Sequence, residues 1–380
     1  MVFLFAGILL LLVLYAAVIF YYNNNWRSLP EYAPKSIMIP STTFSIIIPA
    51  RNEANNIGPL LDSILSQTYS RDLFEVIVVD DHSTDETASI VSRYAGVRLL
   101  QLKEDRINSY KKKAIETGIA AAKNEWIVCT DADCIVTPEW LQALASFISD
   151  KEPVFVAAPV SFFAGTSLKE KQESILYIFQ ALDFLTLQGI TGASVAGKKH
   201  NMCNGANLAY KRQVFYEVDG FKGIDNIASG DDMLLMHKIW KRYPEQIGYL
   251  KSKEAIVETE AAPTWKAFFN QRIRWASKAT SYDDKRIFIV LLLVYLFNCS
   301  FLALLVLSFF NIVYLYAFLV FIVLKTAAEI SFVGRVSRFF NSRHLLKYFF
   351  FFQPLHIGYT IISGFLGTFG SYEWKGRKVK

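Results

Sequence analysis

Two carboxylates follow a short apolar run near the middle of the chain. Asp131 and Asp133 come directly after residues 126–130. Carboxylate oxygens two residues apart on a loop suit Mg²⁺, which takes one or two carboxylates and completes its shell with substrate phosphates and water. Alone the pair has little weight, because about one Asp-x-Asp is expected by chance at this length. The pair predicts a metal site only if other polar residues join it.

Two further polar clusters end apolar runs in the same way. Residues 44–48 lead through Pro49 to residues 51–53, and residues 75–79 lead to residues 80–81. Stripes of helical period lie between the three runs: Ile57, Leu60, Leu61, Ile64 and Leu65 in one stretch, and Ala114, Ile115, Ile119 and Ala122 in another. This alternation predicts an α/β fold with a mostly parallel sheet flanked by helices. Ligands of such sheets bind beyond the carboxyl ends of the strands, where all three clusters lie.

Some of these residues have a purely structural alternative. Asp80 and Asp81 precede residues 83–86, Ser-Thr-Asp-Glu, which is typical of a helix cap. For Asp81, capping and ligand binding are equally favoured. The chain lacks G-x-x-x-x-G-K-[ST] and a strand-linked G-x-G-x-x-G, which disfavours P-loop and dinucleotide sites.

The composition indicates membrane segments around one water-soluble domain. The chain has 380 residues, 53% hydrophobic, with a mean hydropathy of +0.26. No Asp, Glu, Lys or Arg occurs in residues 2–22, 287–324 or 348–372. A crossing needs about 20 apolar residues, so the second run is long enough for two. The first run could be a signal peptide, but no Lys or Arg precedes it, which favours an N-terminal anchor.

The charges beside these runs predict the orientation. Basic residues follow the first run and precede the other two: Arg27, Lys35, Lys278, Lys285, Arg286, Arg335, Arg338, Arg343 and Lys347. Positive charge marks the cytosolic face, so we expect the water-soluble domain to be cytosolic. The expected membrane is a bacterial inner membrane. Four cysteines without zinc-ligand spacing fit a reducing compartment. The net charge of +6 fits basic flanks on anionic lipid, and no basic stripe suggests nucleic acid.

Seven motifs in order resemble glycosyltransferase family 2, with its GT-A fold. They are SIIIPARNE (45–53), VIVVDDHSTDET (76–87), KKKAIETGI (111–119), TDADC (130–134), NGANLAYKR (204–212), SGDD (229–232) and QRIRW (271–275). The Q-x-x-R-W element resembles the membrane-bound branch, which includes polysaccharide synthases and ceramide glucosyltransferases. The resemblance implies an inverting hexosyltransferase that uses a UDP-sugar and Mg²⁺ or Mn²⁺.

The resemblance also implies site residues on the donor side. Those that would hold the nucleoside are Ala50, Arg51, Glu53 and Asp81 (or Asp80). Lys111 would lie near the donor phosphates, although Lys112 and Lys113 leave that assignment open. Asp131 would lie under the nucleotide and help hold the metal, and Asp133 would be its main ligand.

Further positions are implied for the sugar and the acceptor. Gly205 and Asn207 would face the donor sugar, and Asp232 would be the general base. Gln271, Arg274 and Trp275 would close over the diphosphate and the acceptor. Trp275 could also anchor an amphipathic segment at the membrane surface, and Asp231 could cap a helix that begins near Met233.

These observations define the expected domains. We predict a transmembrane helix over 1–24, a cytosolic GT-A domain over 25–263, an amphipathic interface segment over 264–286, a transmembrane or re-entrant region over 287–372 and a basic cytosolic tail over 373–380. Pro354 and three glycines should bend the last apolar run. Lys325 and Glu329, expected near one end of a helix, could form an interfacial pair or assist acceptor entry.

The expected partners are a UDP-sugar, membrane lipids, and a lipid or saccharide acceptor. The closing residues 374–377, Trp-Lys-Gly-Arg, resemble the tail of lipid-directed members and favour a lipid. A processive polysaccharide synthase is the alternative within the family. A nucleotidyltransferase would not explain QRIRW beside a membrane region, and a non-catalytic scaffold would not need carboxylates at 133 and 232.

Overall fold

A computed structural model describes residues 1–34, 41–105, 107–163, 174–199, 202–227, 229–278, 284–370, 372–374 and 377–379. The chain divides into two compact units. The α/β unit comprises the described parts of Leu29–Phe163 and Asn201–Glu260. The helical unit comprises those of Met1–Ser28, Ala164–His200 and Ala261–Lys380.

A seven-stranded sheet forms the centre of the α/β unit, in the order β3-β2-β1-β4-β8-β6-β9. β1 pairs in parallel with β2 and β4, and β2 with β3. β8 runs antiparallel to β4 and β6, and β6 pairs in parallel with β9. The strands are β1 (Phe44–Ala50), β2 (Phe74–Asp80), β3 (Val97–Gln101), β4 (Trp126–Cys129), β6 (Phe155–Ala157), β8 (Leu208–Lys211) and β9 (Ile247–Tyr249).

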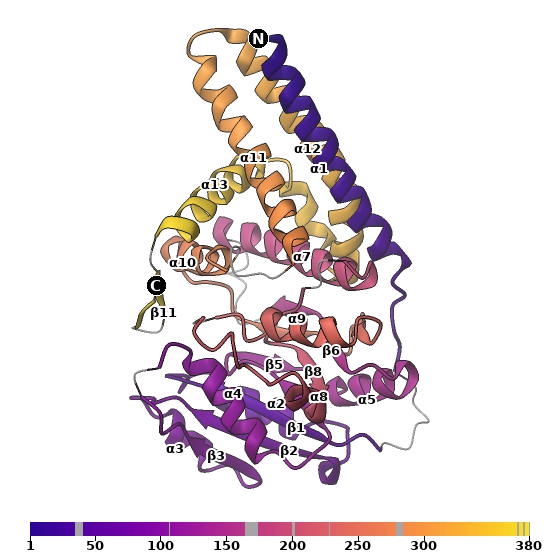
Figure 1. The fold of residues 1–380 in the computed structure, drawn as a ribbon, viewed down its shortest axis with the longest axis vertical. Coiled ribbons are helices and arrows are strands. Elements are labelled where there is room, and N and C mark those ends of the chain that lie inside the picture. The colour runs from indigo at the N-terminus through magenta and orange to yellow at the C-terminus, as the bar shows by residue number, and fades with distance from the viewer. Residues whose placement is uncertain are drawn as a thin grey trace. The chain divides into compact units, whose positions relative to one another are not determined.

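A second sheet has three short strands in the order β5-β10-β7, and helices accompany both sheets. Its strands are β5 (Cys134–Val136), β10 (Val257–Thr259) and β7 (Val160–Phe162). The helices are α2 (Ile57–Leu65), η1 (Arg71–Leu73), α3 (Thr87–Val91), α4 (Tyr110–Ala121), α5 (Trp140–Lys151), α8 (Arg212–Glu217) and α9 (Met233–Arg242). Figure 1 shows this arrangement. The expected mostly parallel α/β sheet is confirmed.

Burial explains why the apolar runs became strands. All seven residues of β1 except Pro49 are buried, and β2 and β4 are almost as fully buried. Strands covered on both faces need continuous apolar sequence. The expected stripes also form: Ile57, Leu60, Leu61 and Ile64 of α2 are buried, as are Ala114, Ile115 and Ile119 of α4.

The strand register brings three polar clusters to one edge. Ala50 lies opposite Asp80, and Ile47 lies opposite Cys129. The residues that follow β1, β2 and β4 therefore leave the sheet on the same side, as parallel strands require. This edge positions the candidate site described below.

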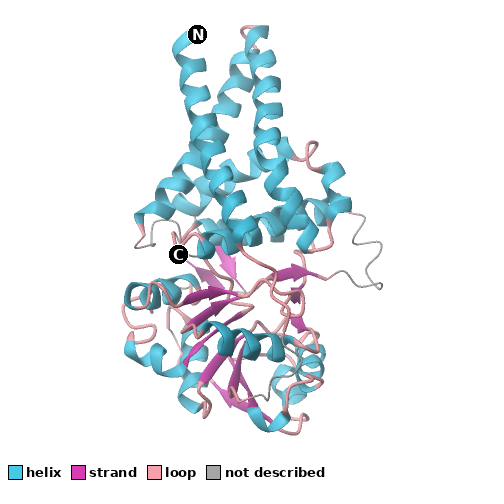
Figure 2. Cartoon of the chain, turned by 90° about the vertical axis from the view of Figure 1, so that its right-hand side faces the viewer, coloured by secondary structure: helices cyan, strands magenta, loops and turns pink. Residues whose placement is uncertain are grey.

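Long helices build the other unit. They are α1 (Val2–Ser28), α7 (Ile175–Ala196), α10 (Trp265–Ala276), α11 (Lys285–Ser308), α12 (Ile312–Phe339), η4 (Arg343–Tyr348) and α13 (Gln353–Phe369). A hairpin of β11 (Tyr372–Trp374) and β12 (Arg377–Val379) follows. Figures 1 and 2 show α1, α11 and α12 side by side, with α7 and α10 lying across one end of them.

Four of these helices are long and apolar enough to cross a membrane: α1, α7, α11 and α12. The spans over 2–22 and 287–324 agree with the sequence. The helix α7 was not expected, because the sequence places residues 25–263 in one domain. Gln180, Asp183 and Gln188 interrupt its apolar pattern, and this conceals a helix of 22 residues.

Two details of the C-terminal region differ from expectation. Pro354 lies in the first turn of α13, where a missing N–H costs nothing, and the helix continues through Gly358, Gly364 and Gly367. Lys325 and Glu329 lie in the middle of α12 and not near its end. Their side chains are buried, with Nζ of Lys325 2.6 Å from Oε1 of Glu329.

Candidate active site

The two carboxylates of the Asp-x-Asp element lie on a tight turn. The turn joins β4 to β5, and the Cys134 N–H donates to the Asp131 carbonyl at 3.2 Å. A four-residue turn keeps both aspartates at the carboxyl end of β4. The Asp131 side chain is about one third exposed (34%), and Asp133 is half-buried. Both carboxylates therefore lie at the edge where the sequence predicted a site.

Lys111 connects this turn to a second acidic segment. Its Nζ lies 2.7 Å from Oδ1 of Asp131 and 3.1 Å from Oδ2 of Asp231. Burial alone would lower the pKa of Lys111, but the Asp131 and Asp231 carboxylates outweigh it and raise the pKa well above 10.5. Lys111 is therefore a fixed positive charge between two carboxylates that are 100 residues apart in sequence.

Asp232 begins α9 and reaches toward Gly205. Its Oδ1 accepts from the Met233 N–H at 2.7 Å, and its Oδ2 accepts from the Gly205 N–H at 3.2 Å. Asp232, and not Asp231, is the residue that caps the helix. A Cβ atom at position 205 would lie 3.2 Å from Asp231 Oδ2 and 3.3 Å from Lys111 Nζ. A glycine there lets the backbone approach both charged groups.

The three consecutive lysines at the start of α4 have three different surroundings. Lys111 faces Asp131 and Asp231. Lys112 is buried, and its Nζ donates to the carbonyls of Ile224, Ile227 and Ser229 at 2.6–3.0 Å. Lys113 lies 3.0 Å from Glu116 and 3.4 Å from Glu104. Successive residues of a helix project about 100° apart, so only one lysine can face the acidic cluster. Of the three, Lys111 is the lysine whose side chain faces the acidic cluster, and its place near the donor phosphates stays a prediction.

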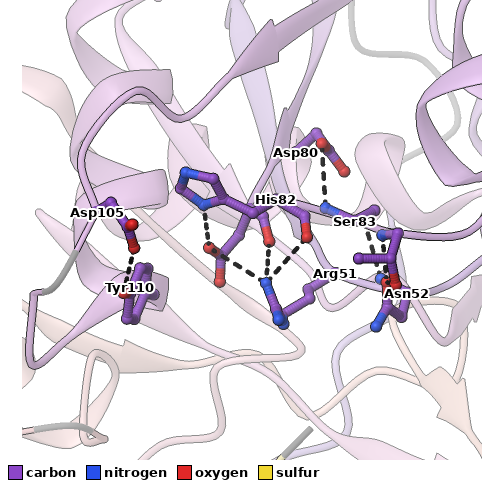
Figure 3. A network of polar contacts seen from close by, with 9 residues as sticks. Arg51, Asn52, Asp80, His82, Ser83, Asp105 and Tyr110 are labelled. Atoms are coloured by element: carbon purple, nitrogen blue, oxygen red, sulfur yellow. Dashed lines mark hydrogen bonds and ion pairs between the residues drawn. The ribbon is translucent and has the colours of Figure 1, made fainter. Parts of the chain in front are cut away.

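A second polar network lies where β1 and β2 end (Figure 3). Nη1 of Arg51 donates to the carbonyls of Asp81 at 2.7 Å and His82 at 3.0 Å, and lies 4.0 Å from Asp81 Oδ1. Nδ1 of His82 lies 3.1 Å from the same carboxylate oxygen. Oδ1 of Asp80 is buried without a hydrogen-bond partner among the described residues. An arginine, two carboxylates and an imidazole are thus gathered at one point.

The loops after β1 and β2 are held to each other. The Asn52 N–H donates to Ser83 Oγ at 2.9 Å, and Asn52 Oδ1 accepts from the Thr84 N–H at 2.8 Å. Asn52 and His82 have positive φ, a backbone conformation that is uncommon outside glycine and frequent at functional sites. The loops after β1 and β2 are therefore connected to each other by hydrogen bonds.

Asp85, and not Asp81, makes the cap-like contacts of this segment. Its Oδ1 accepts from the Thr87 N–H at 3.0 Å, and its Oδ2 accepts from the Ala54 N–H at 3.0 Å. Asp81 contacts Arg51 and His82 instead. Of the other nucleoside candidates, Ala50 is buried and its carbonyl accepts from the Asp81 N–H at 2.8 Å. Glu53 is largely buried, and its Oε2 accepts from Asn56 at 2.8 Å.

Asn207 was expected to face the donor sugar, and the structure places it in the interior. Its side chain is fully buried, with Nδ2 donating to the Pro159 carbonyl at 2.8 Å and the Ala255 carbonyl at 2.7 Å. Its Oδ1 accepts from Trp140 Nε1 at 3.0 Å. Three protein partners engage the amide, so Asn207 joins the backbone of Pro159 and Ala255 to Trp140, and its contact with the donor sugar stays a prediction.

The residues of the QRIRW element lie on α10 in the helical unit. Gln271 Oε1 is buried and has no hydrogen-bond partner among the described residues. Arg274 is half-buried, and the Trp275 ring packs on Phe184 of α7 with centroids 6.3 Å apart. Gln271, Arg274 and Trp275 thus share one helix, separate from the α/β unit that carries Asp131 and Asp232.

The acidic cluster has the donor chemistry for a divalent cation that also binds phosphate. Among the described residues, no three His, Cys, Asp or Glu side chains are arranged to hold a metal without other ligands. Asp131 and Asp133 can offer carboxylate oxygens, and a nucleoside diphosphate and water would complete the shell. Hard cations such as Mg²⁺ and Mn²⁺ favour such oxygen ligands. The residues therefore fit the expected metal.

Two contributors escaped sequence reasoning. Lys112 holds the segment before Asp231, and a lysine that binds carbonyls has no sequence signature. His82 contacts Asp81 directly, and its position after the acidic pair was a signal that could have been used.

The fold is an α/β sheet with basic and acidic clusters at its carboxyl edge, where proteins of this fold class bind ligands. Residues 45–219 match the model of Glycosyl transferase family 2. The chain therefore contains a glycosyltransferase family 2 domain, and its fold is of the GT-A type.

Two relatives resemble this chain in sequence, and one solved structure shares its fold. The chain is 26% identical over 257 residues to the "Probable glycosyltransferase YdaM" of Bacillus subtilis, covering 66% of this chain and 58% of the relative. It is 26% identical over 251 residues to the poly-beta-1,6-N-acetyl-D-glucosamine synthase of Staphylococcus epidermidis, covering 61% and 53%. The chain thus spans little more than half the length of these relatives.

The fold also matches the mannosyltransferase PcManGT from Pyrobaculum calidifontis, solved with GDP-Man and Mn²⁺. The TM-score is 0.60 at 21% identity, over 96% of this chain and 97% of the other. At that identity the match supports the fold alone.

Proposed function

We propose that this protein is an inverting, metal-dependent hexosyltransferase that moves a sugar from a UDP-sugar to a hydroxyl of a lipid or other membrane-associated acceptor. The observation that carries the proposal is the cluster of Lys111, Asp131, Asp231 and Asp232 around Gly205. It joins a candidate metal turn to a second acidic pair through one ammonium group. An enzyme that transfers a sugar needs both parts within reach of one anomeric carbon.

The chemistry assigns different work to the two acidic segments. An inverting transfer needs one carboxylate to accept the proton of the attacking hydroxyl, and Asp232 is our candidate. Hydrogen bonds from Met233 and Gly205 fix its orientation. A divalent cation held by Asp133 and Asp131 would supply positive charge to the leaving diphosphate. Lys111 adds a protein charge at the same place, and Arg274 and Trp275 are our candidates for closing the site.

The two connected loops after β1 and β2 are our candidate nucleoside site. Arg51, Asp81 and His82 gather there, and Asp80 Oδ1 is a buried acceptor without a partner among the described residues. A base N–H or a ribose hydroxyl would satisfy such an acceptor. Uracil follows from the family resemblance. Guanine has N–H donors too, and PcManGT binds GDP-Man, so GDP-mannose is the donor to compare.

The membrane setting favours a membrane-associated acceptor. The chain has four helices suited to crossing a bilayer, and we place the α/β unit in the cytosol of a bacterial cell from the distribution of basic residues. A processive synthase that exports a β-linked polymer is the second candidate, favoured by the similarity to poly-beta-1,6-N-acetyl-D-glucosamine synthase.

One experiment separates these possibilities. The purified chain in lipid nanodiscs is incubated with Mn²⁺, a panel of UDP-sugars and GDP-mannose, and either membrane lipids or oligosaccharides. We expect UDP release that depends on lipid and a single glycolipid product whose anomeric configuration is inverted. A ladder of polymer lengths would support the synthase instead. Absence of nucleoside diphosphate release from every donor would contradict a transferase, and pyrophosphate release would indicate a nucleotidyltransferase.

A further inference from the structure

The interior of the QRIRW element contains a buried ion pair. Nη2 of Arg272 on α10 lies 2.6 Å from Oδ2 of Asp183 on α7. The side chains of Arg272 and Asp183 are only 3% and 4% exposed. The Tyr359 hydroxyl of α13 donates to the other oxygen of Asp183, Oδ1. One carboxylate thus joins three helices of the helical unit.

Two aromatic rings of α10 lie close to the same guanidinium. The Arg272 Cζ lies 4.9 Å from the centroid of Phe268 and 4.3 Å from that of Trp275, both on α10. Arginine stacks favourably on aromatic faces, most strongly on tryptophan. The orientation of the Trp275 ring is therefore tied to the Asp183 ion pair through Arg272.

Neighbouring contacts hold α10 along one side. Gln180 of α7 exchanges two hydrogen bonds of 3.0 Å with the backbone of Ala262, just before α10. Phe268 packs edge-on against Phe179 of α7 and Tyr359 of α13, with centroids 5.6 and 5.4 Å apart. The side of α10 that carries Phe268 and Arg272 is therefore fixed against α7 and α13.

The pair is better suited to orientation than to stability. Burying two charges costs free energy that their attraction seldom exceeds, and apolar pairs of similar volume often stabilise as well or better. None of the three guanidinium nitrogens of Arg272 makes a hydrogen bond to a described residue, and neither does Oδ2 of Asp183. The two groups form a close ion pair without hydrogen-bond geometry, which adds to the cost. This buried pair and the aromatic contacts of Arg272 together still restrict the rotation of α10 about its axis. Gln271, Arg274 and Trp275 then project in set directions, because helix residues are about 100° apart.

We propose that Arg272, held by Asp183 and Tyr359, is the positioning residue that orients Gln271, Arg274 and Trp275 for donor and acceptor. The inference rests on the proposed function of those three residues. Arg272 acts through them and does not touch substrate. Lys325 and Glu329 provide a matched control in the same unit. They form a second buried ion pair, with Nζ of Lys325 2.6 Å from Oε1 of Glu329. Their other hydrogen bonds among the described residues go to Tyr15 and Gln353, neither of which lies on α10.

The test compares two double variants that each neutralise one buried pair. Asp183→Asn with Arg272→Met removes the positioning pair, and Glu329→Gln with Lys325→Met removes the control pair. Both leave no unpaired buried charge, so both should fold. We expect the first to lower kcat for transfer about 10²-fold, as small misplacements of catalytic groups do. The second should keep the wild-type affinity for the UDP-sugar. Its kcat is not compared, since Lys325 and Glu329 could also assist acceptor entry.

A second readout does not depend on catalysis. Hydrogen exchange of the α10 amides, residues 265–276, should become faster in the Asp183→Asn, Arg272→Met variant and remain slow in the control. Wild-type kinetics together with wild-type exchange in the first variant would overturn the inference, as would equally accelerated exchange of the α10 amides in the control. If the wild type transfers no sugar, the proposed function fails, while the exchange result still decides whether Arg272 holds α10.

Single variants decide the question if the double variant does not fold. Tyr359→Phe removes one hydroxyl, and Arg272→Lys keeps the charge but loses the planar stacking on Trp275. We expect each to lower kcat about 10-fold and to lower the Tm by a few degrees, which leaves the chain folded at the assay temperature. Wild-type kcat in both variants would overturn the inference.

Discussion

The Nζ of Lys111 lies 2.7 Å from Oδ1 of Asp131 and 3.1 Å from Oδ2 of Asp231, so one ammonium group links the Asp-x-Asp turn to the acidic pair that begins α9. The functional consequence is that Lys111, Asp131 and the acidic pair should respond together when any one of them is changed.

Replacing Lys111 with methionine tests this link. Two facing carboxylates would lose their shared cation, so we expect the Tm to fall by a few degrees and kcat/KM to fall about 10²-fold. Lys113→Met is the control, because Lys113 pairs only with the exposed Glu104 and Glu116 among its recorded partners, and it should retain activity. If Lys111→Met had the kcat/KM of the wild type, the proposal that Lys111 belongs to the active site would be wrong.

The pH dependence of the same variant has a defined sign. The folded-state pKa of Lys111 is raised, so its stabilising contribution is complete below 10.5 and is lost only as the pH rises through the folded-state value. The Tm difference between wild type and Lys111→Met should therefore be constant near neutrality and shrink only at strongly alkaline pH. A difference that disappears between about pH 6 and 8 would contradict the pairing.

Asp232→Asn separates proton transfer from binding. Asparagine is as good an N-cap as aspartate, so α9 should begin normally. If Asp232 is the base, UDP-sugar affinity measured by calorimetry should be nearly unchanged while kcat falls by about 10²–10⁴-fold. A variant that loses donor affinity but turns over normally at saturation would place Asp232 in the donor pocket instead.

Asn207→Ala should lower the stability of the fold and leave the KM for the donor sugar nearly unchanged. The substitution leaves Trp140 Nε1 and the Ala255 carbonyl without this buried partner, while the Pro159 carbonyl keeps the Val257 N–H at 3.1 Å. Each unsatisfied group costs about 1–3 kcal/mol, so we expect a large drop in Tm. The KM for the donor in the remaining folded enzyme should be close to wild type. A raised KM at unchanged Tm would restore the expectation that Asn207 contacts the sugar.

Labelling of a cysteine introduced at Val379 can show on which side of the membrane the C-terminal segment lies. Three full crossings after the α/β unit would leave the basic residues at the end of the chain outside, against the positive-inside tendency. We predict that α13, 17 residues long, does not cross simply and that residues 374–377 return to the cytosolic face.

Labelling of Val379→Cys in sealed, oriented vesicles tests this path. We expect an impermeant maleimide to label it only after permeabilisation. Background should be low, because burial raises the pKa of the Cys129 thiol to about 12 and raises that of Cys134 as well. Cys299→Ser removes the one half-buried thiol of α11. Labelling from outside without permeabilisation would mean three crossings.

Local sequence was sufficient to predict the sheet edge but not the contacts across the fold. The runs before Arg51, Asp81 and Asp131 are apolar enough to be read as buried parallel strands, and their ends then coincide. The helix α7 was missed because Gln180 and Asp183 break its apolar pattern. That interruption reflects partners more than 70 residues away, Ala262 and Arg272, which no local pattern reveals.

The central claim is that Asp133 and Asp131 hold a divalent cation on which sugar transfer depends. The direct measurement is transfer from the UDP-sugar by wild type and Asp133→Ala, in Mn²⁺ and in excess EDTA, beside Mn²⁺-dependent UDP binding. We expect transfer only by wild type with Mn²⁺, with weakened UDP binding in Asp133→Ala and, to a lesser degree, in Asp131→Ala. Turnover of the wild type in excess EDTA, or wild-type activity in Asp133→Ala, would contradict it.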